Sequence, residues 1–330
     1  MSRLVAALAA LVIAVVACQP AAPSNQPLSR LTVGLGFIPS VQFAQFYRAQ
    51  QQGYYEAAGL DVVFQHEIDP NLITLVGQGA VDIGMADGTS IIPAAGQGIP
   101  VRYVASIYAR FPSVVISGAA SGITTPADLS GRSLGIPGRF GSSWIMLQAL
   151  LASAGLSPDD LDIQLYPDFG QSAALRLGVV DAATGFRNNE PVQLALAGFP
   201  TTVIDVDAVT PLPGPGLTVG ETTLAAKRDQ LRAFVAATLR AMDEIATDPE
   251  AGLNDAIAQV PELGIDRAVQ LAILQATIEM WRTPYTDEHG LGALDAAAWS
   301  QSIEFMRGLP DTNIPADLTA DQLLSEEVLP

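Results

Sequence analysis

Short apolar runs and longer amphipathic segments alternate along the first part of the chain. Three runs have the length and composition of strands: residues 31–35, 61–64 and 83–86. The segments between them carry apolar residues at helical spacing and predict helices near residues 41–58 and 70–77. This part of the chain is therefore expected to fold as β-α-β-α-β.

The same order of elements recurs further along the chain. Its strands are predicted at residues 132–136, 161–165 and 182–184, and its helices near residues 142–154 and 171–177. Gly59 and Gly155 hold the same place in the two copies, directly after a helix, where glycine enters a left-handed turn without a Cβ penalty. The sequence thus contains an internal repeat of one supersecondary unit.

Strands that alternate with helices of this length predict parallel sheets covered by helices on both faces. Two such units predict a two-lobed α/β clamp, with lobe one at residues 30–117 and 206–330 and lobe two at residues 118–205. The chain is expected to leave lobe one through a strand at 108–117 and to return through the Pro- and Gly-rich stretch 202–219. Since ligands of open α/β sheets lie beyond the carboxyl ends of the strands, the predicted site is a cleft between the lobes.

The chain begins with a segment typical of export. Arg3 precedes an apolar run at residues 4–17, which is too short to span a bilayer comfortably and predicts a signal peptide at residues 1–17. The run ends at Cys18 in a string that resembles the bacterial lipobox, although an ordinary signal with a chance cysteine would look the same. We expect Cys18 to carry a lipid and residues 18–29, rich in Pro, Ala, Ser and Gln, to form a flexible tether.

Composition excludes several classes of function. The formal net charge of −18 repels nucleic acid, so no nucleic-acid partner is expected. Cys18 is the only cysteine, and its acylation would leave no thiol for disulfides, zinc or catalysis. His66 and His289 are the only histidines and lie far apart, which makes a metal site or a catalytic triad a poor expectation.

Three strings carry a resemblance to a known family. They are Gly-Tyr-Tyr-Glu-Ala-Ala-Gly-Leu-Asp-Val at 53–62, Gly-Ala-Val-Asp-Ile-Gly at 79–84 and Thr-Pro-Ala-Asp-Leu-Ser-Gly-Arg-Ser-Leu-Gly at 125–135. The chain resembles, roughly over residues 30–310, the solute-binding proteins for aliphatic sulfonates, thiamine-pyrimidine precursors and riboflavin, a family that includes the fungal thiamine-pyrimidine synthase. The resemblance implies a type II periplasmic-binding-protein-like clamp and, as partners, a small-molecule ligand and an ABC permease with its ATPase.

The resemblance also bears on whether the protein is an enzyme. In the synthase, the strand end that matches residues 84–90 bears a lysine that holds the cofactor and a histidine that reacts. Ala86 and Ser90 stand at those positions here, and Lys227 is the only lysine of the chain. We therefore expect a binding protein that needs no cofactor.

The first two strand-end loops supply four candidate ligand contacts. Phe37 matches a family aromatic that stacks on a heterocycle, with Gln42 as a hydrogen-bonding neighbour, and core packing of Phe37 is the alternative. Asp87 and Thr89 lie where a strand ends and a helix begins, so their side chains are predicted to face the cleft. Asp87 would accept a hydrogen bond from a ring N–H, or else cap that helix.

The third loop combines glycines, an arginine and two aromatic residues before a helix. A sulfonate receptor would use this helix start, with Ser142 in its first turn and Arg139 beside it, to bind an oxyanion. Phe140 and Trp144 instead suit a flat ring.

The fourth loop is the most polar of the set. An amide and a carboxylate at Asn189 and Glu190 are suited to read the donor and acceptor edge of a pyrimidine-like ring, although Glu190 would also cap the helix opened by Pro191. Tyr108 and Arg110, at the first crossing between lobes, are predicted to line the cleft floor.

Together the loops favour a flat, uncharged heteroaromatic vitamin or precursor. Ring stacking would supply affinity and the polar pair selectivity. Riboflavin is the favoured ligand because the string Gly-Phe-Arg-Asn-Asn-Glu-Pro at 185–191 resembles the riboflavin receptors. A thiamine pyrimidine precursor is the first alternative and an alkanesulfonate the second, with an enzyme of the synthase type last.

Overall fold

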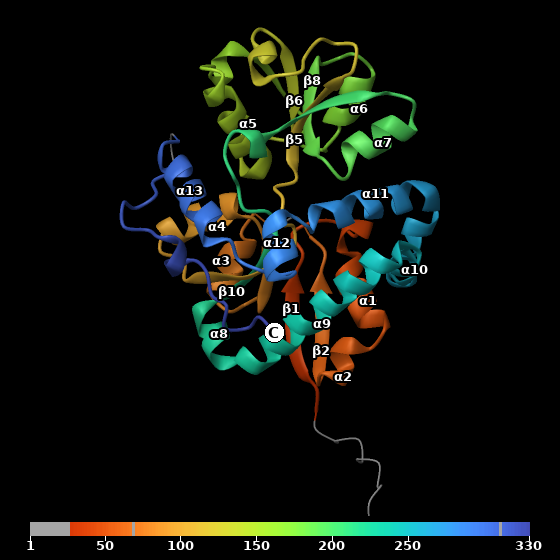
Figure 1. The fold of residues 1–330 in the computed structure, drawn as a ribbon, viewed down its shortest axis with the longest axis vertical. Coiled ribbons are helices and arrows are strands. Elements are labelled where there is room, and N and C mark those ends of the chain that lie inside the picture. The colour runs from red at the N-terminus through yellow and green to blue at the C-terminus, as the bar shows by residue number, and fades with distance from the viewer. Residues whose placement is uncertain (1–26, 68–69, 310–311) are drawn as a thin grey trace, which may run out of the picture.

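The computed structural model describes residues 27–67, 70–309 and 312–330. Two five-stranded sheets, one above the other, are each flanked by helices (Figure 1). The predicted signal peptide and Cys18 lie outside the described residues. Within the described residues, no helix has the length and hydropathy needed to cross a membrane.

The first sheet has the strand order β2-β1-β3-β10-β4. Its strands are β1 (Ser29–Gly34), β2 (Leu60–Gln65), β3 (Ile83–Ala86), β4 (Val101–Ser106) and β10 (Gly216–Gly220). β1 pairs in parallel with β2 and β3, whereas β10 runs antiparallel to β3 and β4. The three strands predicted in the first repeat are therefore present and parallel.

The second sheet repeats this arrangement with the order β7-β6-β8-β5-β9. Its strands are β5 (Ser113–Gly118), β6 (Ser133–Ile136), β7 (Asp162–Leu165), β8 (Ala182–Phe186) and β9 (Thr201–Asp205). β6 pairs in parallel with β7 and β8, and β5 runs antiparallel to β8 and β9. The internal repeat inferred from the sequence is thus a repeat of sheet topology.

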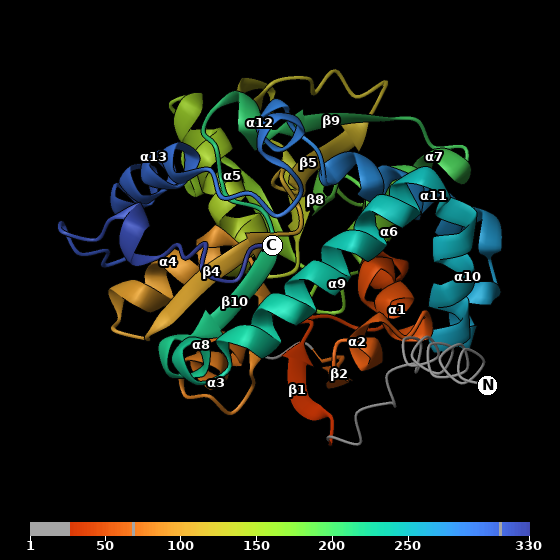
Figure 2. The ribbon, with the colours of Figure 1, turned by 60° about the horizontal axis from the view of Figure 1, so that its bottom comes forward.

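Helices cover the faces of both sheets. The helices of the first repeat are α1 (Ala44–Gln51), α2 (Tyr54–Ala57), α3 (Leu72–Gly77) and α4 (Gly88–Gly96). Those of the second repeat are α5 (Gly141–Ser153), α6 (Gln171–Arg176) and α7 (Glu190–Leu196). The C-terminal helices are α8 (Glu221–Ala226), α9 (Arg228–Thr247), α10 (Pro249–Gln259), α11 (Arg267–Met280), α12 (Pro284–His289) and α13 (Ala296–Arg307). Around the first sheet, α1 packs with α9 and α10 on one side, and α4 packs with α13 on the other (Figure 2).

Glycine conformation sets several helix ends. The single helix predicted over residues 41–58 is wrong: it divides into a short 3₁₀ turn (Val41–Phe43), α1 and α2. The break between α1 and α2 falls at Gly53, whose φ of 70° is incompatible with a continuous right-handed helix. Gly59 and Gly155 have φ values of 78° and 70°, which confirms the left-handed turns predicted for them.

Two crossings join the sheets, at residues 107–112 and 206–215. A strand over 108–117 was expected to leave the first sheet, but β5 pairs with β8 and β9 and so belongs to the second. The crossings are bonded to each other, since the backbone N–H of Tyr108 donates to the carbonyl of Pro215 at 2.8 Å. A movement of one crossing is therefore expected to displace the other.

The largest apolar core lies between the first sheet and the helices α1, α9 and α11. Aromatic rings dominate it: Tyr55 stacks on Phe234 with ring centroids 4.9 Å apart, and Trp281 is 1% exposed. A separate core forms around β6 and α5. The cores hold each sheet with its helices, while the loops at the strand ends remain available for other contacts.

Candidate functional site

Loops at the carboxyl ends of the strands meet between the two sheets. Phe37, after β1, touches Phe169, after β7, edge to face with ring centroids 6.0 Å apart. Gln42, also after β1, is hydrogen-bonded to Asn188, after β8. These contacts join the two halves of the predicted cleft, so the lobes touch in this conformation.

Asn188 connects the lobes through its side-chain amide. It is fully buried, and its Nδ2 group donates to Oε1 of Gln42 at 2.9 Å and to Oγ1 of Thr277, on α11, at 2.8 Å. The hydroxyl of Tyr108 lies 3.3 Å from the same nitrogen. Because Nδ2 has two hydrogens, the two short contacts are the main bonds. Asn188 is a residue that the sequence analysis missed, although the Asn-Asn-Glu string drew attention to its neighbours.

Asn189 and Glu190 are engaged within the second lobe. Oδ1 of Asn189 accepts from the Gln193 side chain at 2.8 Å on the surface. Oε2 of Glu190, the first residue of α7, accepts from the backbone N–H of Phe186 at 2.6 Å. Burial raises the pKa of Glu190, and this backbone hydrogen bond opposes the rise. Glu190 is not the cap of α7 that the alternative described, since Asn189 is the N-cap residue and makes no side-chain capping bond; the Glu190 carboxylate instead closes the turn between β8 and α7.

This arrangement predicts different effects for two substitutions of Glu190. Glu190→Gln keeps an oxygen that can accept from Phe186, so its unfolding free energy should stay within about 1 kcal/mol of the wild type. Glu190→Ala leaves that partly buried N–H without its partner and should lower the unfolding free energy by about 1 to 3 kcal/mol. Urea denaturation of the two variants measures the difference. Equal midpoints for glutamine and alanine would contradict the structural role.

Asp87 and Thr89 form the beginning of α4. Oδ1 of Asp87 accepts from the hydroxyl of Thr89 at 2.6 Å and from the backbone N–H of Ser90 at 3.2 Å. Asp87 is 8% exposed, and burial raises its pKa while these hydrogen bonds lower it. This geometry fits the capping alternative, and the backbone of the loop reaches the second crossing because the N–H of Gly88 donates to the carbonyl of Pro213 at 3.0 Å.

The remaining predicted contacts occupy different environments. Phe37 packs partly against the core of the first sheet. Phe140, just before α5, is 72% exposed. Trp144 packs against the core of the second sheet, and the guanidinium of Arg139 lies over its ring at 5.5 Å from the centroid. Ser142 is partly buried in the first turn of α5.

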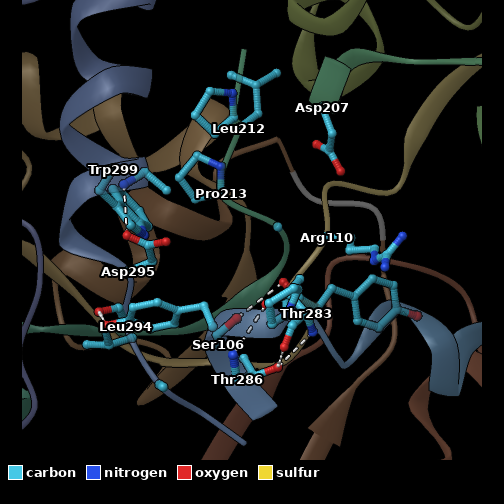
Figure 3. Close-up of a pocket in the computed structure, with 18 of the residues that line it drawn as sticks. Ser106, Arg110, Asp207, Leu212, Pro213, Thr283, Thr286, Leu294, Asp295 and Trp299 are labelled. Carbon is cyan, nitrogen blue, oxygen red and sulfur yellow. Dashed lines mark hydrogen bonds between the residues drawn. The ribbon is translucent and has the colours of Figure 1, made fainter. Parts of the chain in front are cut away.

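A pocket of about 340 Å³ lies beside the crossings (Figure 3). It is lined by both crossings and by the segment from α12 to the start of α13. The lining includes Ser106, Tyr108, Arg110, Asp207, Pro213, Thr283, Asp295 and Trp299. Tyr108 therefore contributes to both regions: it lines this pocket, and its hydroxyl lies beside Nδ2 of Asn188 at the lobe junction. Burial raises the pKa of Tyr108, so its hydroxyl stays neutral.

The charged groups of the pocket sit mainly at the crossings. Asp207 reaches solvent at the pocket edge, and partial burial together with the neighbouring carboxylate of Asp205 raises its pKa to about 6, against the opposing effect of Arg110 and Arg187. Asp205 forms an ion pair with Arg187. Asp295 caps α13 by accepting from the Ala298 N–H at 2.9 Å.

No metal centre or lysine-dependent site is assembled within residues 27–67, 70–309 and 312–330. No group of three or more His, Cys, Asp or Glu side chains there could hold a metal ion. Lys227 forms an ion pair of 2.7 Å with Asp82, which precedes β3, whereas Ala86 and Ser90 lie at the other end of that strand. His66 contacts the rings of Phe43 and Tyr47, and burial lowers its pKa.

One family model and several known proteins match the sequence of this chain. The family model described as NMT1/THI5 like matches residues 40–252. The chain is 33% identical to the riboflavin-binding protein RibY of Chloroflexus aurantiacus, over 94% of this chain and 89% of that protein. It is 27% identical to the 4-amino-5-hydroxymethyl-2-methylpyrimidine phosphate synthase THI13 of Saccharomyces cerevisiae, over 72% of this chain and 73% of that one.

Solved structures share the architecture at lower identity. The aliphatic sulphonate binding protein SsuA of Escherichia coli superposes with a TM-score of 0.70 at 17% identity, over 89% of this chain and 96% of that one. The alkanesulfonate-binding protein SsuA of Xanthomonas axonopodis pv. citri gives a TM-score of 0.68 at 18% identity, over 91% and 99%. These likenesses establish the two-lobed type II periplasmic-binding-protein fold. From the family model and the relative at 33% identity, we conclude that the chain belongs to the NMT1/THI5-like family.

Proposed function

We propose that this protein is the extracytoplasmic solute-binding component of an ABC importer and captures a flat heteroaromatic vitamin, riboflavin first, between its two lobes. The observation that carries the proposal is the 33% identity to a riboflavin-binding protein over nearly the whole of both chains. A thiamine pyrimidine precursor is the second candidate, because the 27% identical relatives are named for a pyrimidine product.

The residues between the lobes support a ligand of this chemistry. A flavin presents a wide aromatic face and an imide edge with alternating donors and acceptors. Phe37 offers an apolar face at the end of β1, and the side-chain amide of Asn188 offers its oxygen as an acceptor while its two N–H groups bond Gln42 and Thr277. Oδ1 of Asn188 is buried without a hydrogen-bond partner in the part of the chain that the structure describes, and opening of the lobes would free it to accept from a ring N–H.

Binding rather than catalysis is proposed for the same region. Ala86 and Ser90 occupy the strand end where the resemblance to the synthase would require a lysine and a histidine. An alanine offers no group to hold a cofactor covalently, and Lys227 is held by Asp82. The synthase relatives then share the fold of this protein without its proposed function.

The cellular arrangement follows from the N-terminal sequence. We propose export directed by residues 1–17, lipid attachment at Cys18 and a tether that holds the clamp near a permease and its ATPase. The tether ends at residue 28, one residue earlier than expected from the sequence, because Ser29 already pairs with Leu60 in β1. We also propose that the lobes are the two sheets with their helices and that they close by bending at the crossings, residues 107–112 and 206–215.

Ligand titration tests the proposal. The protein is unfolded in urea, dialysed to remove any bound compound, refolded, and titrated with riboflavin, the formylated thiamine pyrimidine and taurine. We expect saturable quenching of flavin fluorescence by stacking, with little dependence on salt. Saturable binding of taurine alone, weakened by rising salt, would overturn the proposal and favour a sulfonate receptor.

A further inference from the structure

The loop between β7 and α6 contains an unusual residue, Phe169. Its φ of 61° lies in the left-handed region, which bulky side chains rarely adopt. The other non-glycine residue with positive φ in the described part of the chain is Asn313, a residue type that tolerates this conformation. The loop holds Phe169 through its N–H, which donates to the Tyr166 carbonyl at 2.9 Å.

The side chain of Phe169 does not contribute to a core. Phe169 is 44% exposed and belongs to none of the apolar clusters of the described residues. Instead it touches Phe37 of the other lobe edge to face, at an interplanar angle of 84°. Both the strained backbone and the exposed ring cost free energy without strengthening the lobe that contains them.

We propose that Phe169 is a specificity-determining residue that contacts the ligand, and that, once a planar ring enters between them and separates Phe169 from its present edge-to-face contact with Phe37, the two side chains form opposite walls of a slot for that ring. The inference rests on the proposed function, because it takes the cleft to bind a flat heteroaromatic compound. Two aromatic side chains on opposite lobes contact both faces of such a ring, and each contact forms only when the lobes close. The slot would select for planarity, whereas polar groups such as Asn188 would select among planar ligands.

Two substitutions separate a ligand contact from a structural contact between lobes. Phe169→Gly removes the ring and relieves the strain, since glycine enters the left-handed region freely. Phe169→Trp keeps a large aromatic face. Leu177→Ala is the matched control, because Leu177 is a 72% exposed apolar residue at the end of α6 in the same lobe.

The variants are titrated with riboflavin and with lumichrome, which has the fused ring but no sugar-alcohol chain. We expect Phe169→Gly to weaken binding of both compounds by about tenfold and equally, because the lost contact is with the ring. Its urea midpoint should nevertheless be no lower than that of the wild type. Phe169→Trp and Leu177→Ala should bind within about twofold of the wild type.

Three results would overturn the inference. Phe169→Gly could bind both compounds as the wild type does, it could weaken riboflavin but not lumichrome, or Phe169→Trp could lose as much affinity as the glycine variant. If the wild type binds neither flavin, the proposed riboflavin function fails, and the same variants are compared with the formylated thiamine pyrimidine. Loss of binding of that flat ring in the glycine variant would still support the slot, and binding of no planar compound would end both proposals.

Discussion

Replacement of Asn188 by alanine should weaken ligand binding about 10- to 100-fold by destabilising the closed clamp. The amide of Asn188 donates to Gln42 and Thr277 across the junction between lobes, in a fully buried position. Without it, Oε1 of Gln42 loses its buried donor and Oγ1 of Thr277 loses one of its hydrogen bonds when the lobes close, whereas water can reach Gln42 when the lobes open. The penalty therefore falls on the closed state and shifts the population toward the open state.

Ligand titration and small-angle scattering together measure this effect. At saturating ligand, the wild type should have a smaller radius of gyration than it has alone, and Asn188→Ala should need a higher ligand concentration to reach the compact form. Asn189→Ala is the informative comparison, because the side-chain oxygen of Asn189 accepts from Gln193 on the surface of the same lobe. From the sequence alone, the larger loss of ligand affinity would be expected for Asn189→Ala, because Asn189 was the predicted ligand contact. Equal losses in the two variants would contradict the role of Asn188 as the connection between lobes.

Replacement of Gly214 by alanine should lower the unfolding free energy by about 3 kcal/mol. A Cβ atom at this position would lie 2.3 Å from the carbonyl oxygen of Tyr108 and 2.6 Å from that of Arg110. Both oxygens belong to the backbone of the other crossing, which hydrogen bonds hold beside this one. The crossings would have to separate, and the bonds that position the lobes would lengthen or break.

Chemical denaturation and scattering test this prediction. Gly264→Ala is the matched control, because a Cβ there would meet only the Cγ2 atom of Ile257, at 3.4 Å. We expect the control to stay within about 1 kcal/mol of the wild type. We also expect Gly214→Ala to change the radius of gyration before any unfolding, since the crossings set the angle between lobes. A Gly214→Ala variant as stable and compact as the control would show that the crossings can move apart without cost.

The sequence by itself was sufficient to predict the two repeated units of the architecture. The repeated β-α-β-α-β pattern predicted two similar units, and the structure contains two sheets of matching topology. Gly59 and Gly155 were predicted to be left-handed, and they are. These features depend on local rules, namely the period of apolar residues and the conformational freedom of glycine, which act over a few residues and are visible in the string. Membership of the family is shown by the comparisons, and the three strings that carried the resemblance, at 53–62, 79–84 and 125–135, lie within the matched residues 40–252.

The sequence identified the right loops but could not assign each side chain in them. In the turn after β8, the carboxylate of Glu190 accepts from Phe186, Asn188 is buried at the lobe junction, and Asn189 bonds to Gln193 at the surface. A shift of one residue exchanges the inward and outward positions. At the start of α4, the choice between capping and ligand contact for Asp87 depended on where Thr89 and Ser90 lie around it.

Contacts between distant segments were decided only by tertiary structure. Membership of β5 in the second sheet depends on pairing with β8 and β9, and the partner of Asn188 on α11 is Thr277, 89 residues away in sequence. The contact of Phe169 with Phe37 likewise joins two loops on different lobes. Periodicity reports which face of an element is apolar, but it carries no information on which element covers that face. The elements were therefore determined by the sequence pattern, and the lobe junction by the way those elements pack.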